Sequence, residues 1–104
     1  MASPDPLAEC IGFDWDEENA SKSWERHRVT PEEAEDLFFH DPLVVPSDAR
    51  HSQTERRYQA LGQSGRGRLL FAAFSVRRKL VRIISVRDMN RRETEEYRRY
   101  EESS

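Results

Sequence analysis

The chain has 104 residues, with 36% apolar and 36% charged side chains, so we expect one small domain with a modest core. Its single cysteine, Cys10, excludes an internal disulfide and fits a reducing compartment. No apolar run approaches the roughly 20 residues of a membrane-spanning helix. The first ten residues also lack the basic region and apolar core of a signal peptide, so we expect a cytoplasmic protein with no membrane partner.

The two halves of the chain carry opposite charge, although the net charge is only −3. Residues 1–48 hold 13 acidic and 3 basic side chains, whereas residues 49–104 hold 7 acidic and 14 basic ones. All basic residues except Lys22 and Lys79 are arginines, whose planar fork suits phosphate and carboxylate. The pattern predicts one basic face opposite acidic helices, and the simpler interpretation is a solvated charged surface.

The N-terminal quarter predicts a loose arm, a strand and a helix. Residues 1–10 form the arm, and residues 11–104 form the single domain. Apolar residues alternate from Ile11 to Trp15, which predicts a short edge strand. A polar helix follows from Asp16 to about His27, with Trp24 as its main apolar anchor.

A second helix has the clearest start in the sequence. Thr30 is placed to cap it, Pro31 takes the first helical position, and Glu33 completes the spacing of a capping box. Its apolar face comprises Ala34, Leu37 and Phe38. The proline at position 42 ends the helix near residue 39, because the residue before a proline avoids helical angles.

The remaining sequence predicts a meander and a last helix. Strands are expected over residues 43–45, 55–63, 68–76 and 80–87, with turns at 64–67 and 77–79 and a helix over 90–102. Short connections make sequential strands antiparallel neighbours. The predicted fold is therefore α+β, with two N-terminal helices, an antiparallel meander of about four strands and a C-terminal helix.

The last strand and the helix after it form the most informative segment. Alternation along the strand predicts that Ser85 and Arg87 point to one face and Arg82 to the other. Asn90 and Glu93 have the spacing of a capping box for the helix. A strand that ends in a fixed arginine beside a basic helix start is suited to holding a phosphate.

Metal and serine-nucleophile chemistry have little support in the sequence. The three histidines and Cys10 lack the paired spacing of zinc ligands, and we expect no cofactor. A Ser-His-Asp site could be composed of Ser85, His51 and Asp48. However, no strained nucleophile elbow surrounds the serine, so this interpretation is disfavoured.

Cleavage of RNA needs only residues that this chain has. The 2′-hydroxyl of RNA is the nucleophile, so the protein supplies an acid or base and cations for the phosphorane charge. His27 or His51 would transfer protons, and Arg82 and Arg87 would stabilise the phosphate. Further RNA contacts are assigned to Arg26, Arg57, Ser85 and Arg91. Taken singly, each histidine is more often structural than catalytic, and each arginine is more often a surface charge.

The sequence carries a series of short motifs in the following order. They are Phe13-Asp14-Trp15-Asp16, Arg26-His27-Arg28-Val29, Thr30-Pro31-Glu32-Glu33-Ala34, Asp41-Pro42, Asp48…His51…Glu55-Arg56-Arg57, Arg82-Ile83-Ile84-Ser85-Val86-Arg87 and Asn90-Arg91-Arg92-Glu93 with Tyr97. In this order and spacing they resemble the BrnT toxin family of bacterial type II toxin–antitoxin systems, over roughly residues 13–100.

The resemblance implies a RelE-like fold and a metal-independent endoribonuclease that cleaves RNA and so inhibits translation and growth. It also implies neutralisation by a BrnA-type antitoxin, with operator DNA bound only through the toxin–antitoxin complex. The alternative is a catalytically degenerate binding module that acts with an antitoxin in a DNA-binding repressor complex.

The sequence departs from the family pattern at four positions. Arg28 stands where the family has glycine, at a helix end where left-handed backbone angles are useful. Asn19 replaces a common lysine, and Ser23 a common asparagine. Asp88 replaces a basic residue that usually follows the arginine of the last strand.

Overall fold

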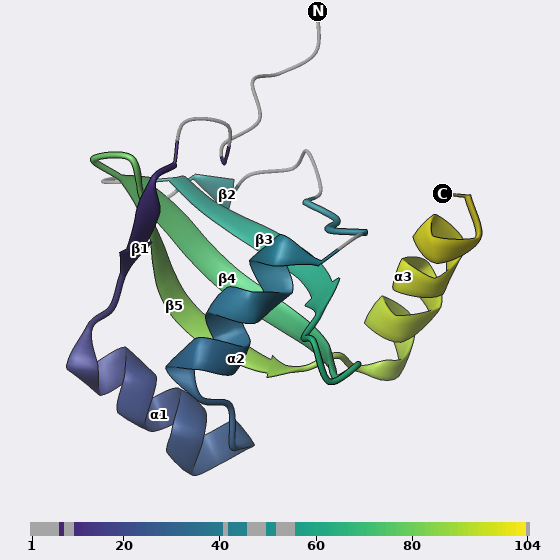
Figure 1. Cartoon of the computed structure of the whole chain (residues 1–104), viewed down its shortest axis with the longest axis horizontal. Coiled ribbons are helices and arrows are strands. Elements are labelled where there is room, and N and C mark those ends of the chain that lie inside the picture. Colours follow the sequence, from purple (N-terminus) through teal and green to yellow (C-terminus); the bar gives the residue numbers. More distant parts are fainter. Residues whose placement is uncertain (1–6, 8–9, 41, 46–49, 52–55, 104) are drawn as a thin grey trace, which may run out of the picture.

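The computed structural model of the chain describes residues 7, 10–40, 42–45, 50–51 and 56–103. Figure 1 shows the helices arranged around a twisted sheet. In chain order the elements are β1 (Gly12–Asp14), α1 (Glu17–His27), α2 (Pro31–Asp36), a 3-10 turn η1 (Leu37–Phe39), β2 (Arg50–His51), β3 (Arg56–Gln63), β4 (Leu69–Arg77), β5 (Leu80–Asp88) and α3 (Arg91–Ser103).

The sheet is mixed, with the strand order β1-β5-β4-β3-β2. β2 to β5 pair antiparallel in sequence, but β1 pairs parallel with β5. The α+β class and the antiparallel pairing of the four sequential strands are thus confirmed, whereas a wholly antiparallel, RelE-like sheet after two N-terminal helices is wrong. β1 precedes the helices, and the long connection between β1 and β5 permits parallel pairing, which a short hairpin cannot.

Residues 43–45 do not form the predicted strand. Only Val44 pairs there, as an isolated bridge to Leu61. Pro42 and Pro46 flank the segment in the sequence, and neither can donate a backbone hydrogen bond to a ladder. The strand that pairs with β3 comes later, at β2, in a segment that the sequence predicts as a polar loop.

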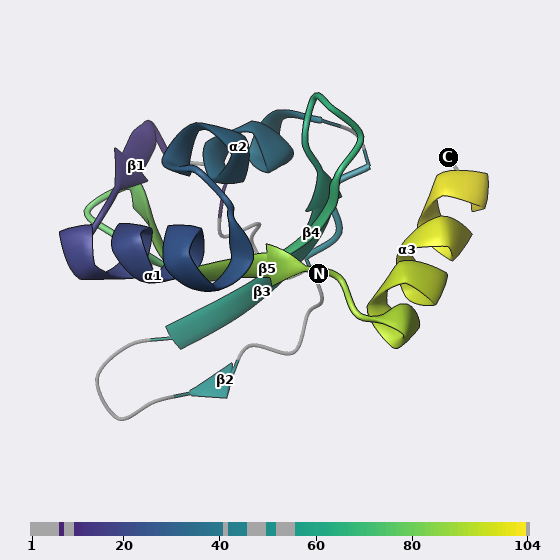
Figure 2. The same cartoon turned by 90° about the horizontal axis from the view of Figure 1, so that it is seen from below.

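The helices α1 and α2 lie together on one face of the sheet (Figure 2). The core lies between these helices and the sheet, and its buried members are Val29, Ala34, Leu37, Ala60, Leu70, Ala72, Phe74, Val81, Ile83 and Val86. Trp24 is not the anchor of α1, since it is 46% exposed. The inner residue of α1 is Ser23, whose small side chain lets the helix lie close to the sheet.

The last helix, α3, stands beyond the end of the sheet and is held there by Tyr97 (Figures 1 and 2). This side chain is fully buried against Val44 and Leu61, and its hydroxyl donates to the carbonyl of Pro42 at 2.7 Å. Tyr100, three residues further along α3, is 48% exposed. One aromatic side chain therefore anchors most of this helix.

The helix starts confirm Thr30 as a cap and the capping box of Asn90 and Glu93. The Glu33 carboxylate accepts from Ser64 and Arg68 instead of closing a box with Thr30. The Thr30 hydroxyl accepts from the Glu33 N–H at 3.1 Å, and Asn90 and Glu93 exchange reciprocal hydrogen bonds of 2.8 and 2.9 Å. Arg28 ends α1 in the left-handed region, with φ 55° and ψ 41°, which glycine adopts more readily. Its guanidinium lies 5.1 Å from the Trp24 ring centroid.

Because an L-residue in the left-handed region is strained, we expect Arg28→Gly to be more stable than Arg28→Ala by about 0.5–1 kcal/mol. Both variants lose the contact with Trp24, so the comparison isolates the backbone. Arg26, which is exposed inside α1, provides the matched pair, and there glycine should be less stable than alanine. Urea unfolding measures all four variants, and equal stabilities at position 28 would contradict the assignment of strain.

Candidate functional site

A β-bulge in β5 determines which side chains share a face of the sheet. Ser75 pairs with Arg82, and Ala73, two residues earlier on β4, pairs with Ser85. The three residue-to-residue steps from Arg82 to Ser85 on β5 therefore lie opposite only two steps on β4, and Ile84 is the extra residue. The predicted alternation, with Arg82 facing away from Ser85, is thus wrong, because the bulge shifts the pleat by one residue.

The bulge places Arg82, Ser85 and Arg87 on the face of the sheet that α1 and α2 leave uncovered. Ala73 and Ser85 pair in register with Gln59 of β3, and Arg57 lies two residues before Gln59, on the same face. Arg57 and Ser85 are exposed. We call Arg57, Arg82, Ser85 and Arg87 the arginine face.

Arg87 is held firmly on the arginine face. Its Nη1 and Nη2 bind the two Glu93 oxygens at 2.8 and 2.9 Å, and Nη1 also donates to the Asp88 carbonyl at 3.1 Å. The guanidinium lies 4.1 Å from the ring centroid of Phe71, the residue opposite on β4. The described contacts leave the Nε–H and one N–H of Nη2 without an acceptor. Two donors in this arrangement are suited to two oxygens of a phosphate.

Glu93 both caps α3 and orients Arg87. Its carboxylate accepts from the Asn90 N–H as well as from the guanidinium. Burial opposes its ionisation, but the hydrogen bonds from Arg87 and Asn90 outweigh burial and lower the pKa of Glu93. Arg87 therefore faces a charged partner at neutral pH.

The other arginines are held less tightly. Arg82 is half-buried and lies 3.8 Å from the Asp16 carboxylate, which caps α1. Arg91, the first residue of α3, is 95% exposed and lies 3.6 Å from Glu95. Arg91 follows closely after Arg87 in the chain, so it extends the basic surface past the end of β5.

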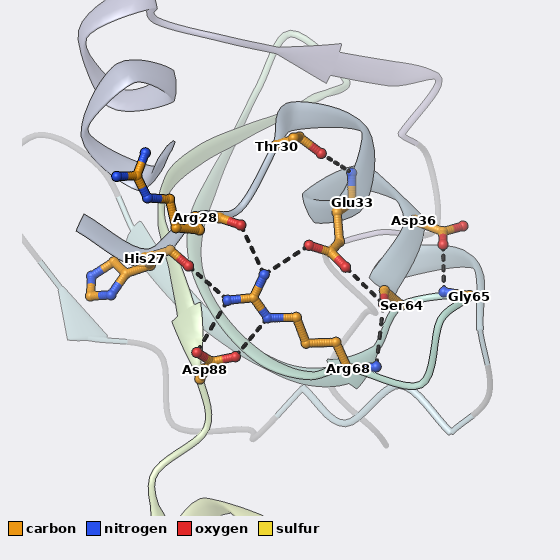
Figure 3. Close-up of polar contacts among 9 residues, drawn as sticks. All are labelled: His27, Arg28, Thr30, Glu33, Asp36, Ser64, Gly65, Arg68 and Asp88. Carbon is orange, nitrogen blue, oxygen red and sulfur yellow. Dashed lines mark hydrogen bonds and ion pairs between the residues drawn. The ribbon is translucent and has the colours of Figure 1, made fainter. Parts of the chain in front are cut away.

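The structure separates His27 and Arg26 from the arginine face. Both lie on α1, which covers the other side of the sheet, and in Figure 3 the His27 ring points away from the Arg68 guanidinium. His51 lies on β2 and pairs in register with Arg56, next to the pair of Arg50 and Arg57. Its role stays a prediction, and Asp48 lies outside the described residues.

Arg68 forms a polar cluster that sequence reasoning did not single out (Figure 3). Its five hydrogen bonds go to both oxygens of Asp88 at 2.7 and 3.1 Å, to Glu33 at 3.0 Å, and to the carbonyls of His27 and Arg28 at 2.7 and 2.9 Å. It joins the end of α1, the start of α2 and the end of β5. The departure at Asp88 was the available signal, since a basic residue there could not pair with Arg68.

Neither a metal cluster nor a membrane helix is found in the described segments. No three His, Cys, Asp or Glu side chains gather there as ligands for a metal ion. No helix in that part of the chain is long and apolar enough to span a membrane.

The fold is that of a small α+β protein, and comparison with known proteins identifies its class. A crystal structure of the ribonuclease toxin BrnT from Brucella abortus superposes with a TM-score of 0.54 over 78% of this chain and 99% of that chain, at 14% identity. The family described as "Ribonuclease toxin, BrnT, of type II toxin-antitoxin system" matches residues 15–93. The chain belongs to this family. No curated protein sequence matches it.

We expect Asp88→Asn to lower the free energy of unfolding by about 0.5–1 kcal/mol at neutral pH, the usual scale for an exposed ion pair. The hydrogen bond from Arg68 lowers the pKa of Asp88 from its usual 3.8, with a smaller contribution from His27. A lowered pKa in the folded state gives stability that is complete above the unfolded pKa and is lost as pH falls through the folded one.

Urea unfolding of wild type and Asp88→Asn at about pH 7, 5 and 3 measures this difference. Glu96→Gln is the control, because Glu96 is an exposed α3 carboxylate for which the structure shows no ion pair among the described residues. A wild-type advantage over Asp88→Asn that persists undiminished at the lowest pH would contradict the assignment.

Proposed function

We propose that this chain is an endoribonuclease toxin that cleaves RNA on its arginine face, without a metal ion. The observation that carries the proposal is the β5 bulge, which puts Arg82, Ser85 and Arg87 on the same face of the sheet as Arg57, away from α1 and α2. Membership of a ribonuclease-toxin family supports the same activity.

In the proposed reaction the RNA 2′-hydroxyl oxygen attacks the adjacent phosphorus, and the bond to the 5′-oxygen breaks. A base takes the 2′-hydroxyl proton, and an acid protonates the leaving oxygen. The products are a 2′,3′-cyclic phosphate and a 5′-hydroxyl. Arg87, preset by Glu93 and Phe71, would bind the charge that develops on the phosphate oxygens.

The other residues have supporting roles in this proposal. Arg82 would bind the phosphate with Arg87, and Arg57, Ser85 and Arg91 would contact the flanking RNA. His51 stays the candidate for proton transfer that the sequence predicts, although its register partner on β3 is Arg56 and not Arg57. The position of α1 argues against the roles predicted for Arg26 and His27.

The proposal includes partners and location. A BrnA-type antitoxin would neutralise the toxin in the cytoplasm, and only the complex of the two would bind operator DNA. The family's membership of type II toxin–antitoxin systems supports an antitoxin partner.

The second candidate is a degenerate binding module that serves only in a repressor complex with an antitoxin. The observation that favours it is that carboxylates already neutralise two members of the arginine face. Arg87 pairs with Glu93 and Arg82 with Asp16. Absence of RNA cleavage by the wild-type chain under any condition would select this candidate.

We expect Arg87→Ala to reduce RNA cleavage by about 10²–10³-fold, the usual effect of losing one preorganised donor. Arg87→Lys should restore only part of the activity, because lysine lacks the planar fork. Cleavage by the wild type should persist in EDTA and leave a 2′,3′-cyclic phosphate, which mass spectrometry of the products detects.

Arg98→Ala is the matched control, since Arg98 is an exposed α3 arginine whose ion pair among the described residues is with Glu101 of the same helix. It should cleave RNA like the wild type. Circular dichroism checks that each variant is folded. Wild-type cleavage by folded Arg87→Ala would overturn the mechanism.

RNA binding should weaken steeply with salt, because phosphate contacts release counterions. If Arg57, Arg82, Arg87 and Arg91 each contact one phosphate, affinity for single-stranded RNA should fall about 50-fold between 50 and 200 mM salt. In Arg87→Ala the slope of log affinity against log salt should be shallower by about 0.7. Fluorescence anisotropy with a labelled RNA measures both, and an affinity independent of salt would contradict the assignment.

A further inference from the structure

The outer edge of β1 has no partner strand among the described residues, because β1 ends the strand order. The Ile11 N–H donates to the Lys79 carbonyl at 2.8 Å, so the backbone of Ile11 faces β5. Alternation along the strand turns the N–H and C=O groups of Gly12 and Asp14 outward. These groups offer a template for one more strand.

An apolar pocket of about 250 Å³ opens beside this edge. Its lining includes Ile11, Gly12, Phe13, Phe38, Phe39 and Val81. At its rim Ile11 is 81% exposed and Phe39 75% exposed. Ring contacts of 5.9 Å between Phe39 and Phe13 and of 5.6 Å between Phe13 and Phe38 connect the rim to the core. An exposed apolar patch of this kind marks an interaction site.

Gly12 makes the edge accessible to another backbone. It lines the pocket and has no side chain to hold an incoming strand away. It also has a reason within the fold, since a Cβ there would meet a Leu80 methyl at 3.3 Å.

Charges of opposite sign mark the two ends of the edge. Exposed Arg78 and Lys79 lie in the turn next to Ile11, and exposed Asp14 lies at the other end of β1. A complementary strand would carry an acidic residue at the first end and a basic residue about three positions away. Between them, alternate apolar side chains would fill the pocket.

We propose that the antitoxin docks at this edge, adding an extended segment of that pattern to β1 as a sixth strand of the sheet. The inference rests on the proposed function only for the existence of an antitoxin partner. It places the antitoxin on the far side of β1 from β5, with β1 between the antitoxin and Arg82.

The test uses the whole chain, co-expressed with the protein encoded by the neighbouring reading frame. Ile11→Asp and Phe39→Ser should each weaken the complex by about tenfold or more, because a polar group then meets the apolar pocket. Tyr100→Ser, at an exposed aromatic residue of α3, should leave the Kd unchanged. Wild-type affinity in folded Ile11→Asp and Phe39→Ser overturns the proposal.

Hydrogen exchange distinguishes strand addition from side-chain contact alone. The amides of Gly12 and Asp14 should be protected in the complex and exchange rapidly in the isolated chain. Unchanged exchange at both amides on complex formation overturns the proposal. The proposal is also overturned if the isolated wild type is a dimer and Ile11→Asp is a monomer, because that result would show a second copy of the chain at this edge.

RNA cleavage without antitoxin separates this inference from the proposed activity. Ile11→Asp and Phe39→Ser lie outside the arginine face and should cleave RNA like the wild type. An inactive wild type that still binds its neighbour-encoded partner through Ile11 overturns the ribonuclease proposal and supports this one. A wild type that cleaves RNA but binds no such partner overturns this one alone.

Discussion

One guanidinium, that of Arg68, holds together the parts of the chain on which the rest depends. Its cation lies at the C-terminal end of α1, where it satisfies carbonyls of the last turn and opposes the negative end of the helix dipole. The same group binds Glu33 of α2 and Asp88 of β5. Since all five N–H groups are used, loss of any one element would leave partly buried polar groups without partners.

Two neighbouring residues of β5 connect the Arg68 cluster to the arginine face. Asp88 points toward the helices and is bound by Arg68, whereas Arg87 points to the open face and is bound by Glu93. The end of β5 is therefore tied on both sides of the sheet. Such double attachment keeps the guanidinium of Arg87 in place without substrate, which is the condition for electrostatic preorganisation.

Local patterns in the sequence predicted what local physics determines. Both helix starts and the two hairpin turns depend on neighbouring residues, and they are confirmed. The bulge at Ile84 and the parallel pairing of β1 depend on residues distant in the sequence, so alternation alone could not reveal them. Trp24 was misassigned because a large apolar residue predicts burial, yet Ser23 faces the sheet. For the candidate site, the sequence predicts which residue types take part, but it does not predict which of them lie on the same face of the sheet.

The division of charge in the sequence overstates how basic the folded surface is. Acidic residues of the first half pair with arginines of the second, as in Asp16 with Arg82 and Glu33 with Arg68. Glu93 pairs with Arg87 from within the basic half. RNA that bound as proposed would share or displace these carboxylates, which would reduce its affinity, whereas the carboxylates keep each guanidinium oriented when no phosphate is present. Net charge by segment thus indicates where phosphate could bind, and the pairing of each arginine decides how strongly it does so.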